Sequence, residues 1–269
     1  SNSTLWMWPL IRHHFFFVFY VFNIFFISAA SANPQRIVGG SLTTIDRYPS
    51  MAGLIYSPNN WLTFYHTCGG IIINNRSILT AARCGYGDLI SQWRIRVGST
   101  WAHSGGVLYN VNQRIAHPTF NLNTLAGDIA ILRSAGNFVF NNNVRAALVA
   151  GPNYIVNDNQ VVWAAGWGDT FAGSYYGSEQ LRHVELRSIN QNTCRNNYLV
   201  RGVTITANHL CSGWVAGGRD QCTYDEGGPL YHNGVVVGVR SFGIGCGQPE
   251  FPGVNTRVSS YSSWININS

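Results

Sequence analysis

The chain contains six cysteines, and their spacing limits the chemistry that they can perform. Thiols could bind a metal or form disulfides, but no two of these cysteines have the C-x-x-C spacing of a metal site. An even number of cysteines is typical of disulfides in a secreted chain, and spacing alone leaves their pairing open. We expect disulfides and no metal site at Cys68, Cys84, Cys194, Cys211, Cys222 and Cys246.

The basic side chains are unusual in kind rather than in number. All 17 lysine-plus-arginine residues are arginine, which keeps its proton in alkaline fluid, whereas lysine begins to lose its own at about pH 10. This composition suits an alkaline environment, although drift in codon usage would produce it too. No basic cluster resembles a nucleic-acid surface. We expect the scattered histidines to be surface or loop residues rather than a general base: His66, His103, His117, His183, His209 and His232.

The amino-terminal stretch has the pattern of a signal peptide. A basic start at 12–14 precedes the apolar run 15–27 and the small-residue end 28–32. The run is shorter than the about 20 residues of a membrane helix, so a signal anchor is the lesser alternative. We predict a signal peptide over 1–32 and no membrane-spanning segment elsewhere.

Short strands separated by turns are predicted from residue 37 onward. Residues 92–97 alternate apolar side chains with arginine. Asn233-Gly234 lies between the apolar runs 230–231 and 235–239 and predicts a hairpin. Other strands are expected at 70–73, 77–80, 128–132 and 161–165, and one helix at 259–266. Many short strands with glycine-rich turns indicate an all-β fold of barrels.

Four segments together resemble the chymotrypsin/trypsin family of serine proteases over residues 37–269. They are RIVGG at 36–40, LTAARC at 79–84, DIAIL at 128–132 and DQCTYDEGGP at 220–229. They occur in the family's order and spacing, and they are most similar to digestive trypsins of the lepidopteran midgut. The resemblance implies two six-stranded antiparallel β-barrels with a cleft between them, a short carboxy-terminal helix, and no cofactor.

The resemblance also implies how the chain matures. Residues 33–36 would be a pro-segment cut after Arg36 by a trypsin-like protease, and the new amine of Ile37 would pair with the carboxylate of Asp225. The product would be a monomeric protease domain over 37–269, secreted into the midgut lumen. The implied disulfides are Cys68–Cys84, Cys194–Cys211 and Cys222–Cys246.

The three catalytic positions of the family are only partly matched. The mechanism needs a hydroxyl nucleophile, an imidazole base and a carboxylate that orients the base. Asp128 takes the carboxylate position, whereas Arg83 stands at the histidine position and Glu226 at the serine position. Arginine cannot accept a proton and a carboxylate is a poor nucleophile, so we expect no peptidase activity. The opposite charges predict that Arg83 bridges Glu226 and Asp128, while independent drift would leave them apart.

The resemblance further implies an oxyanion hole and a specificity pocket. The backbone N–H groups of Tyr224 and Glu226 match the oxyanion hole, in which glycine is usual at the first position. Asp220 matches the acid that binds a basic substrate side chain at the base of a trypsin pocket. The remaining pocket residues pair with substrate backbone or keep the pocket open: Ser241, Phe242, Gly243 and Gly253.

These positions lead to one expected function and two alternatives. We expect a secreted, inactive homologue that binds arginine- or lysine-containing peptides, or protein protease inhibitors, without cleaving them. The alternatives are an active digestive endopeptidase that cleaves after arginine or lysine, and a degenerate copy that binds nothing. The sequon at Asn75 leaves glycosylation open.

Overall fold

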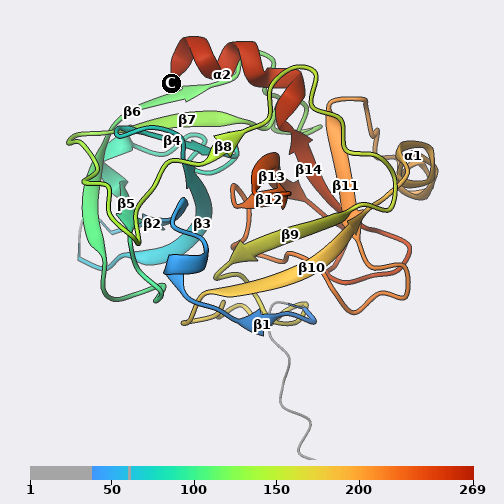
Figure 1. The fold of residues 1–269 in the computed structure, drawn as a ribbon, viewed down its shortest axis with the longest axis horizontal. Helices are drawn as coiled ribbons and strands as arrows, with labels where there is room; N and C mark the ends of the chain where they lie inside the picture. The colour runs from blue at the N-terminus through green and yellow to red at the C-terminus, as the bar shows by residue number, and fades with distance from the viewer. Residues whose placement is uncertain (1–37, 60–61) are drawn as a thin grey trace, which may run out of the picture. The chain divides into compact units, whose positions relative to one another are not determined.

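The computed structural model describes residues 38–59 and 62–269 (Figure 1). The predicted signal peptide at 1–32, the pro-segment at 33–36 and the predicted amine of Ile37 lie outside the described residues. In the described ranges no helix combines the length and apolar character that a membrane crossing requires.

Six antiparallel strands close the first barrel, in the order β2-β3-β4-β7-β6-β5 (Figure 1). Its core is built from strands whose side chains point alternately inward and outward. In Trp93–Val97, for example, Trp93, Ile95 and Val97 are buried, and the two arginines between them are half-buried. The strands are β2 (Met51–Tyr56), β3 (Tyr65–Ile72), β4 (Ser77–Thr80), β5 (Trp93–Val97), β6 (Val107–Ala116) and β7 (Ala130–Ser134).

The second barrel is closed because β9 pairs with both β10 and β12. Its strands are β9 (Val161–Gly166), β10 (Arg182–Ser188), β11 (His209–Gly213), β12 (Pro229–His232), β13 (Val235–Phe242) and β14 (Gly253–Arg257). Two short strands extend this sheet: β1 (Ser41–Leu42) beside β10, and β8 (Leu148–Val149) parallel to β13. The predicted fold of two six-stranded antiparallel barrels is confirmed.

Turn chemistry and helix caps agree with the local sequence. Asn233 and Gly234 have φ of 49° and 77°, as a tight hairpin between β12 and β13 requires. The predicted carboxy-terminal helix is present as η3 (Val258–Tyr261) followed by α2 (Ser262–Asn268). Shorter 3-10 turns are η1 (Ile45–Arg47) and η2 (Ile90–Gln92).

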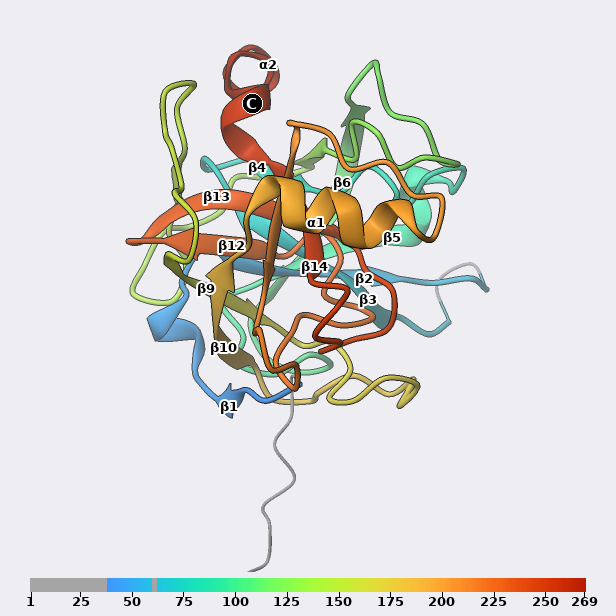
Figure 2. The ribbon, with the colours of Figure 1, turned by 90° about the vertical axis from the view of Figure 1, so that its right-hand side faces the viewer.

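One helix was not predicted. α1 (Gln191–Leu199) lies on the outer side of the second barrel (Figure 2) and buries only Cys194 and Tyr198, so its sequence carries no apolar stripe. Its start was nevertheless readable, because the Asn190 side chain accepts the N–H groups of residues 192 and 193, a typical helix cap.

The disulfides join the chain as the resemblance implied. Cys68 is bonded to Cys84, Cys194 to Cys211 and Cys222 to Cys246. The first bond ties β3 to the segment of Arg83, and the third ties the segment of Asp220 to the loop after β13. Two of the bonds therefore restrain segments that carry candidate site residues.

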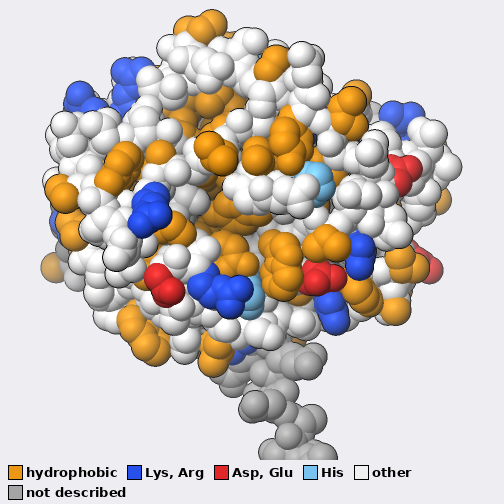
Figure 3. Space-filling model, viewed as in Figure 1, with side chains coloured by type: hydrophobic (Ala, Val, Ile, Leu, Met, Phe, Trp, Pro, Cys, Tyr) orange, Lys and Arg blue, Asp and Glu red, His pale blue; other side chains and the backbone are white. Residues whose placement is uncertain are grey.

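Three of the six histidines that were predicted to be surface or loop residues differ from that prediction. His66, His209 and His232 are buried rather than exposed, because each lies within a barrel strand. On the face shown in Figure 3, basic side chains are scattered among acidic and apolar ones rather than gathered into one patch.

Candidate active site

Asp128 lies where the two barrels meet, and both of its carboxylate oxygens accept hydrogen bonds. The hydroxyl of Ser241, on β13, donates to Oδ2 at 2.6 Å, and the backbone N–H of Arg83 donates to Oδ1 at 2.8 Å. The Thr256 hydroxyl, on β14, donates to the Asp128 carbonyl oxygen at 2.7 Å. Donors from both barrels thus fix Asp128, a fully buried residue that precedes β7 of the first barrel.

The protonation of Asp128 reflects opposing influences. Burial raises the pKa of Asp128 to about 6, against the hydrogen bonds from Ser241 and Arg83 and the charge of Arg83, which lower it. The carboxylate is therefore ionised in alkaline solution and takes up a proton in weak acid.

The side chain of Arg83 does not form the predicted bridge. Its Nη1 donates to the carbonyl oxygen of Ser241 at 3.0 Å. In residues 38–59 and 62–269, no ion pair links the Arg83 guanidinium to Glu226 or Asp128. The bridge prediction is wrong because each side chain has a nearer backbone partner, a carbonyl oxygen for Arg83 and an N–H group for Glu226.

That N–H group belongs to Tyr224. Tyr224 has φ of 73°, a left-handed conformation that favours glycine, and its N–H donates to Oε2 of Glu226 at 2.8 Å. The Glu226 carboxylate therefore occupies a donor that the resemblance assigns to the oxyanion hole.

Arg83 and Glu226 line one cavity of about 310 Å³, together with Tyr224, Asp88 and Thr67. A carboxylate in such a cavity can accept a proton from water, whereas the guanidinium can only donate hydrogen bonds. The cavity thus offers a base and a cation, but neither a hydroxyl nor an imidazole comes from positions 83 and 226.

One histidine that was predicted to be a surface or loop residue contacts the backbone of Tyr224, which lines this cavity. His66 is buried on β3, and its Nε2 lies 3.2 Å from the carbonyl oxygen of Tyr224. Burial lowers the pKa of His66 to about 4, against the hydrogen bond to Tyr224, so its ring is neutral at neutral and alkaline pH. Only its place in the folded barrel reveals this contact.

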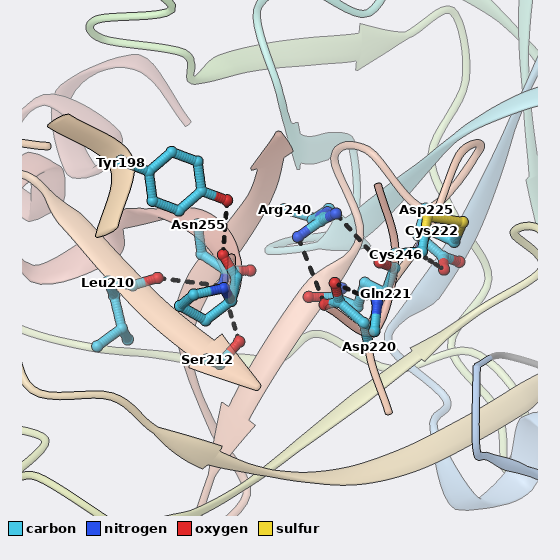
Figure 4. A network of polar contacts seen from close by, with 12 residues as sticks. Tyr198, Leu210, Ser212, Asp220, Gln221, Cys222, Asp225, Arg240, Cys246 and Asn255 are labelled. Atoms are coloured by element: carbon cyan, nitrogen blue, oxygen red, sulfur yellow. Dashed lines mark hydrogen bonds and ion pairs between the residues drawn. A yellow bond between two sulfur atoms is a disulfide. The ribbon is translucent and has the colours of Figure 1, made fainter. Parts of the chain in front are cut away.

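The region around Asp220 differs from the open pocket that was predicted. The guanidinium of Arg240, on β13, faces it: Nη1 lies 3.7 Å from Oδ1 of Asp220, and Nη2 donates to the carbonyl oxygen of Gln221 at 3.0 Å (Figure 4). The backbone N–H of Gly247 donates to Oδ2 of Asp220 at 3.2 Å. Burial raises the pKa of Asp220 to about 6, and the charge of Arg240 opposes that rise.

The two predicted pocket glycines border the Arg240 side chain. A Cβ on Gly253 would lie 2.2 Å from Nη1 of Arg240, and one on Gly243 would lie 2.9 Å from Nη2. Their small size therefore makes room for the chain's own arginine. Phe242 packs edge-on against Tyr198.

Asp225 is a third buried carboxylate. Its Oδ1 accepts the N–H of Gly168 at 2.8 Å, and its Oδ2 accepts the N–H of Cys222 at 2.9 Å. Burial raises the pKa of Asp225 to about 7, against these two hydrogen bonds. Its predicted partner, the amine of Ile37, lies outside the described residues.

Comparison with known proteins decides the family. The family model described as Trypsin matches residues 37–265. This chain belongs to the trypsin family. It is 57% identical to "Trypsin, alkaline B" of Manduca sexta over 90% of this chain and 94% of the relative. Trypsin CFT-1 of Choristoneura fumiferana is 56% identical with the same coverage, and Achelase-1 of Lonomia achelous is 49% identical over 86% of this chain and all of the relative.

These relatives overturn the prediction that this trypsin-family chain is not an enzyme. Four of them, 55–57% identical over 90% of the chain, are named trypsins, which points to an active serine protease. The prediction was wrong because it weighed two side chains against a likeness that extends over most of the domain. The individual roles of Arg83, Asp128 and Glu226 stay predictions.

Proposed function

We propose that this member of the trypsin family is a secreted endopeptidase that hydrolyses peptide bonds in protein substrates. The observation that carries the proposal is the Asp128 carboxylate, held between the barrels by the Ser241 hydroxyl and the Arg83 amide. A buried, fixed carboxylate at this point is what the family's mechanism requires as its orienting group. The names of the relatives support the same activity.

The side chains at 83 and 226 set the rate that we expect. Arg83 has no lone pair with which to take a proton, and Glu226 has no hydroxyl. The Glu226 carboxylate can take a proton from water in their shared cavity, while the Arg83 guanidinium can donate to an oxyanion. We therefore propose that water, as it gives a proton to Glu226, attacks the carbonyl carbon of the peptide bond. Glu226 then returns that proton to the leaving amine as the C–N bond breaks, which yields a free carboxylate and a free amine. This reaction is slower than attack by the hydroxyl of a serine–histidine pair would be.

A protein-hydrolysis assay tests the proposal. Protein cleaved after Arg36 is incubated with a fluorescently labelled casein at alkaline pH, beside a Glu226→Gln control purified in the same way. We expect slow cleavage that is proportional to enzyme concentration and is lost in the control, because glutamine cannot take the proton. Cleavage by the wild-type protein no faster than by Glu226→Gln overturns the proposal.

Restoring the family's side chains shows that the assay can detect the chemistry. We expect the double variant Arg83→His/Glu226→Ser to raise kcat by at least about 1000-fold, which is well within the about millionfold loss that removal of either group causes in related enzymes. It also releases the Tyr224 N–H from the Glu226 carboxylate. If the double variant cleaves casein and the wild type does not, the assay is valid and the proposal is wrong.

Maturation completes the proposal. We propose secretion through the leader at 1–32 and activation by a trypsin-like protease after Arg36. The carboxylate of Asp225 supports this step, because it is buried and, within the described part of the chain, takes part in no ion pair. A new amine at Ile37 would supply the missing cation. Peptides and protein protease inhibitors are the ligands we propose for the cleft.

A further inference from the structure

Arg240 lies where the resemblance places the pocket for a substrate's basic side chain. Arg240 lies on β13 directly before Ser241. Its side chain is 3% exposed, and that of Asp220 is 2% exposed. The guanidinium reaches Asp220 and the carbonyl oxygen of Gln221 from inside the protein (Figure 4). A cation of the chain itself therefore faces Asp220, where the resemblance would place a bound arginine or lysine.

Charge opposes the entry of a second cation. Asp220 carries one negative charge, and Arg240 already compensates it at 3.7 Å. A substrate guanidinium beside the same carboxylate would leave two cations facing one anion in a buried site, where like charges repel far more strongly than in water. No ion pair brings another carboxylate to Arg240 among the described residues.

The lack of space beside Asp220 also opposes the entry of a second basic side chain. A single carbon atom added to Gly253 would come within 2.2 Å of Arg240 and within 2.5 Å of Asp220. A basic side chain that passed Gly243 and Gly253 would therefore meet the Arg240 guanidinium beside Asp220. Binding would require Arg240 to leave a site in which its Nη2 is hydrogen-bonded.

The internal pair is poorly satisfied. Oδ1 of Asp220, Oε1 of Gln221, and Nε and Nη1 of Arg240 are buried without a hydrogen-bond partner. Buried polar atoms without partners are costly, and they are uncommon in folded proteins. The site therefore presents unused N–H donors where an anionic floor was predicted.

We propose that Arg240 is the specificity-determining residue of this cleft, and that it excludes arginine and lysine side chains from Asp220. The preferred substrates are then peptides with an uncharged or acidic side chain at that position. The proposal rests on the proposed function for the place of the peptide, but it does not require that the peptide is cleaved.

Calorimetric titration with benzamidine, a small aryl amidinium, tests this directly in the Arg36-cleaved protein. We expect no saturable binding by the wild type at millimolar ligand. Arg240→Val frees the space and the carboxylate, and we expect it to bind at least about 100-fold more tightly, because a charged partner is regained. Arg240→Met fills the space without the charge and should stay as weak as the wild type.

Asp220→Asn in the Arg240→Val background should abolish the gain, which assigns the binding to this carboxylate. If Arg240→Val does not fold, Arg240→Ser opens the same space with a side chain that can hydrogen-bond. One-to-one binding of benzamidine by the wild type overturns the proposal, as does a folded open variant that gains nothing. Since the titration needs no turnover, a failed hydrolysis assay and a failed pocket proposal give different results.

Discussion

Asp128 and Asp220 are both buried carboxylates whose pKa is raised to about 6 by burial, yet they are stabilised in different ways. Asp128 accepts short hydrogen bonds on both oxygens from neutral donors of two separate segments. Asp220 accepts the Gly247 N–H at 3.2 Å and faces a cation at 3.7 Å, and its Oδ1 is buried without a hydrogen-bond partner.

The difference shows what each carboxylate is built to do. Neutral donors fix the position of Asp128 and leave its charge free to act on a neighbour. The charge of Asp220 is compensated by the buried charge of Arg240. Removing either of these two residues therefore leaves an uncompensated charge in the protein interior. We expect changes at Asp128 to appear in turnover and changes at Asp220 to appear in stability and ligand choice.

The largest effect should come from Asp128→Asn in the Arg83→His/Glu226→Ser background. We expect kcat to fall by about 10⁴-fold, because the restored imidazole loses the carboxylate that orients it. Steady-state hydrolysis of labelled casein measures it. Asp88→Asn, which alters a carboxylate lining the cavity of Arg83 and Glu226, is the matched control and should change kcat only a few-fold. Similar losses in both variants would contradict a special role for Asp128.

A smaller effect is expected from Asp220→Asn in the wild-type background. It leaves the Arg240 guanidinium buried without a counter-charge, and we expect a loss of about 3–5 kcal/mol in the free energy of unfolding. Ser241→Ala removes one neutral donor from Asp128 and should cost only about 1–3 kcal/mol. Urea denaturation with the disulfides intact compares them, and a larger loss in Ser241→Ala would reverse the comparison.

Asp225 extends the comparison of buried carboxylates to the pH dependence of stability. Its pKa of about 7 in the folded, uncleaved chain lies above the ordinary aspartate value of 3.8, so between these two values the folded state holds a proton that the unfolded state has released. This contribution is fully present below about pH 4 and is lost as pH rises toward 7. Relative to Asp225→Asn, we expect the wild type to lose about 3–4 kcal/mol of unfolding free energy across that range.

Cleavage after Arg36 gives the control for this pH dependence. If the new amine of Ile37 pairs with Asp225, the carboxylate stays ionised and the difference in slope between wild type and Asp225→Asn shrinks. An unchanged slope after complete cleavage, measured by urea denaturation at each pH, would count against the proposed activation step.

The smallest effect concerns Tyr224, whose N–H is held by Glu226. Tyr224→Gly relieves a left-handed backbone conformation that costs about 1–2 kcal/mol for a residue with a side chain. Part of that gain is offset by the greater chain entropy of glycine, so we expect a stabilisation below about 1 kcal/mol. Asn233→Gly is the control, since asparagine tolerates its φ of 49°, and should change stability less. A destabilised Tyr224→Gly protein would show that the tyrosine ring contributes to packing.

Much of the fold was predictable because its signals are local. The alternation of 92–97, the Asn233-Gly234 turn and the short apolar runs each indicate a strand or a hairpin before any tertiary contact forms. The exception is α1, which has no apolar periodicity and is held by two buried side chains and a cap. The disulfides followed from the family's pattern, since spacing alone left them open.

The contacts of the candidate site were less predictable, because each side chain bonds to whichever partner the fold brings nearest to it. The opposite charges of Arg83 and Glu226 predicted a bridge, but backbone groups next to each side chain took their hydrogen bonds. Arg240 could have been noticed as the one charged residue in the apolar strand 235–242. Nothing in that pattern says that its guanidinium lies against Asp220, 20 residues earlier in the chain.

By itself, the sequence determined the strands, the two-barrel family and the kinds of groups available, because periodicity, turn residues and motif order are properties of neighbouring positions. The tertiary structure decided the pairing of the charges. It placed Ser241 of one barrel on Asp128 of the other, left Arg83 and Glu226 unpaired with each other, and filled the space over Asp220 with Arg240. Distances between segments far apart in the chain set these contacts, and only folding fixes those distances.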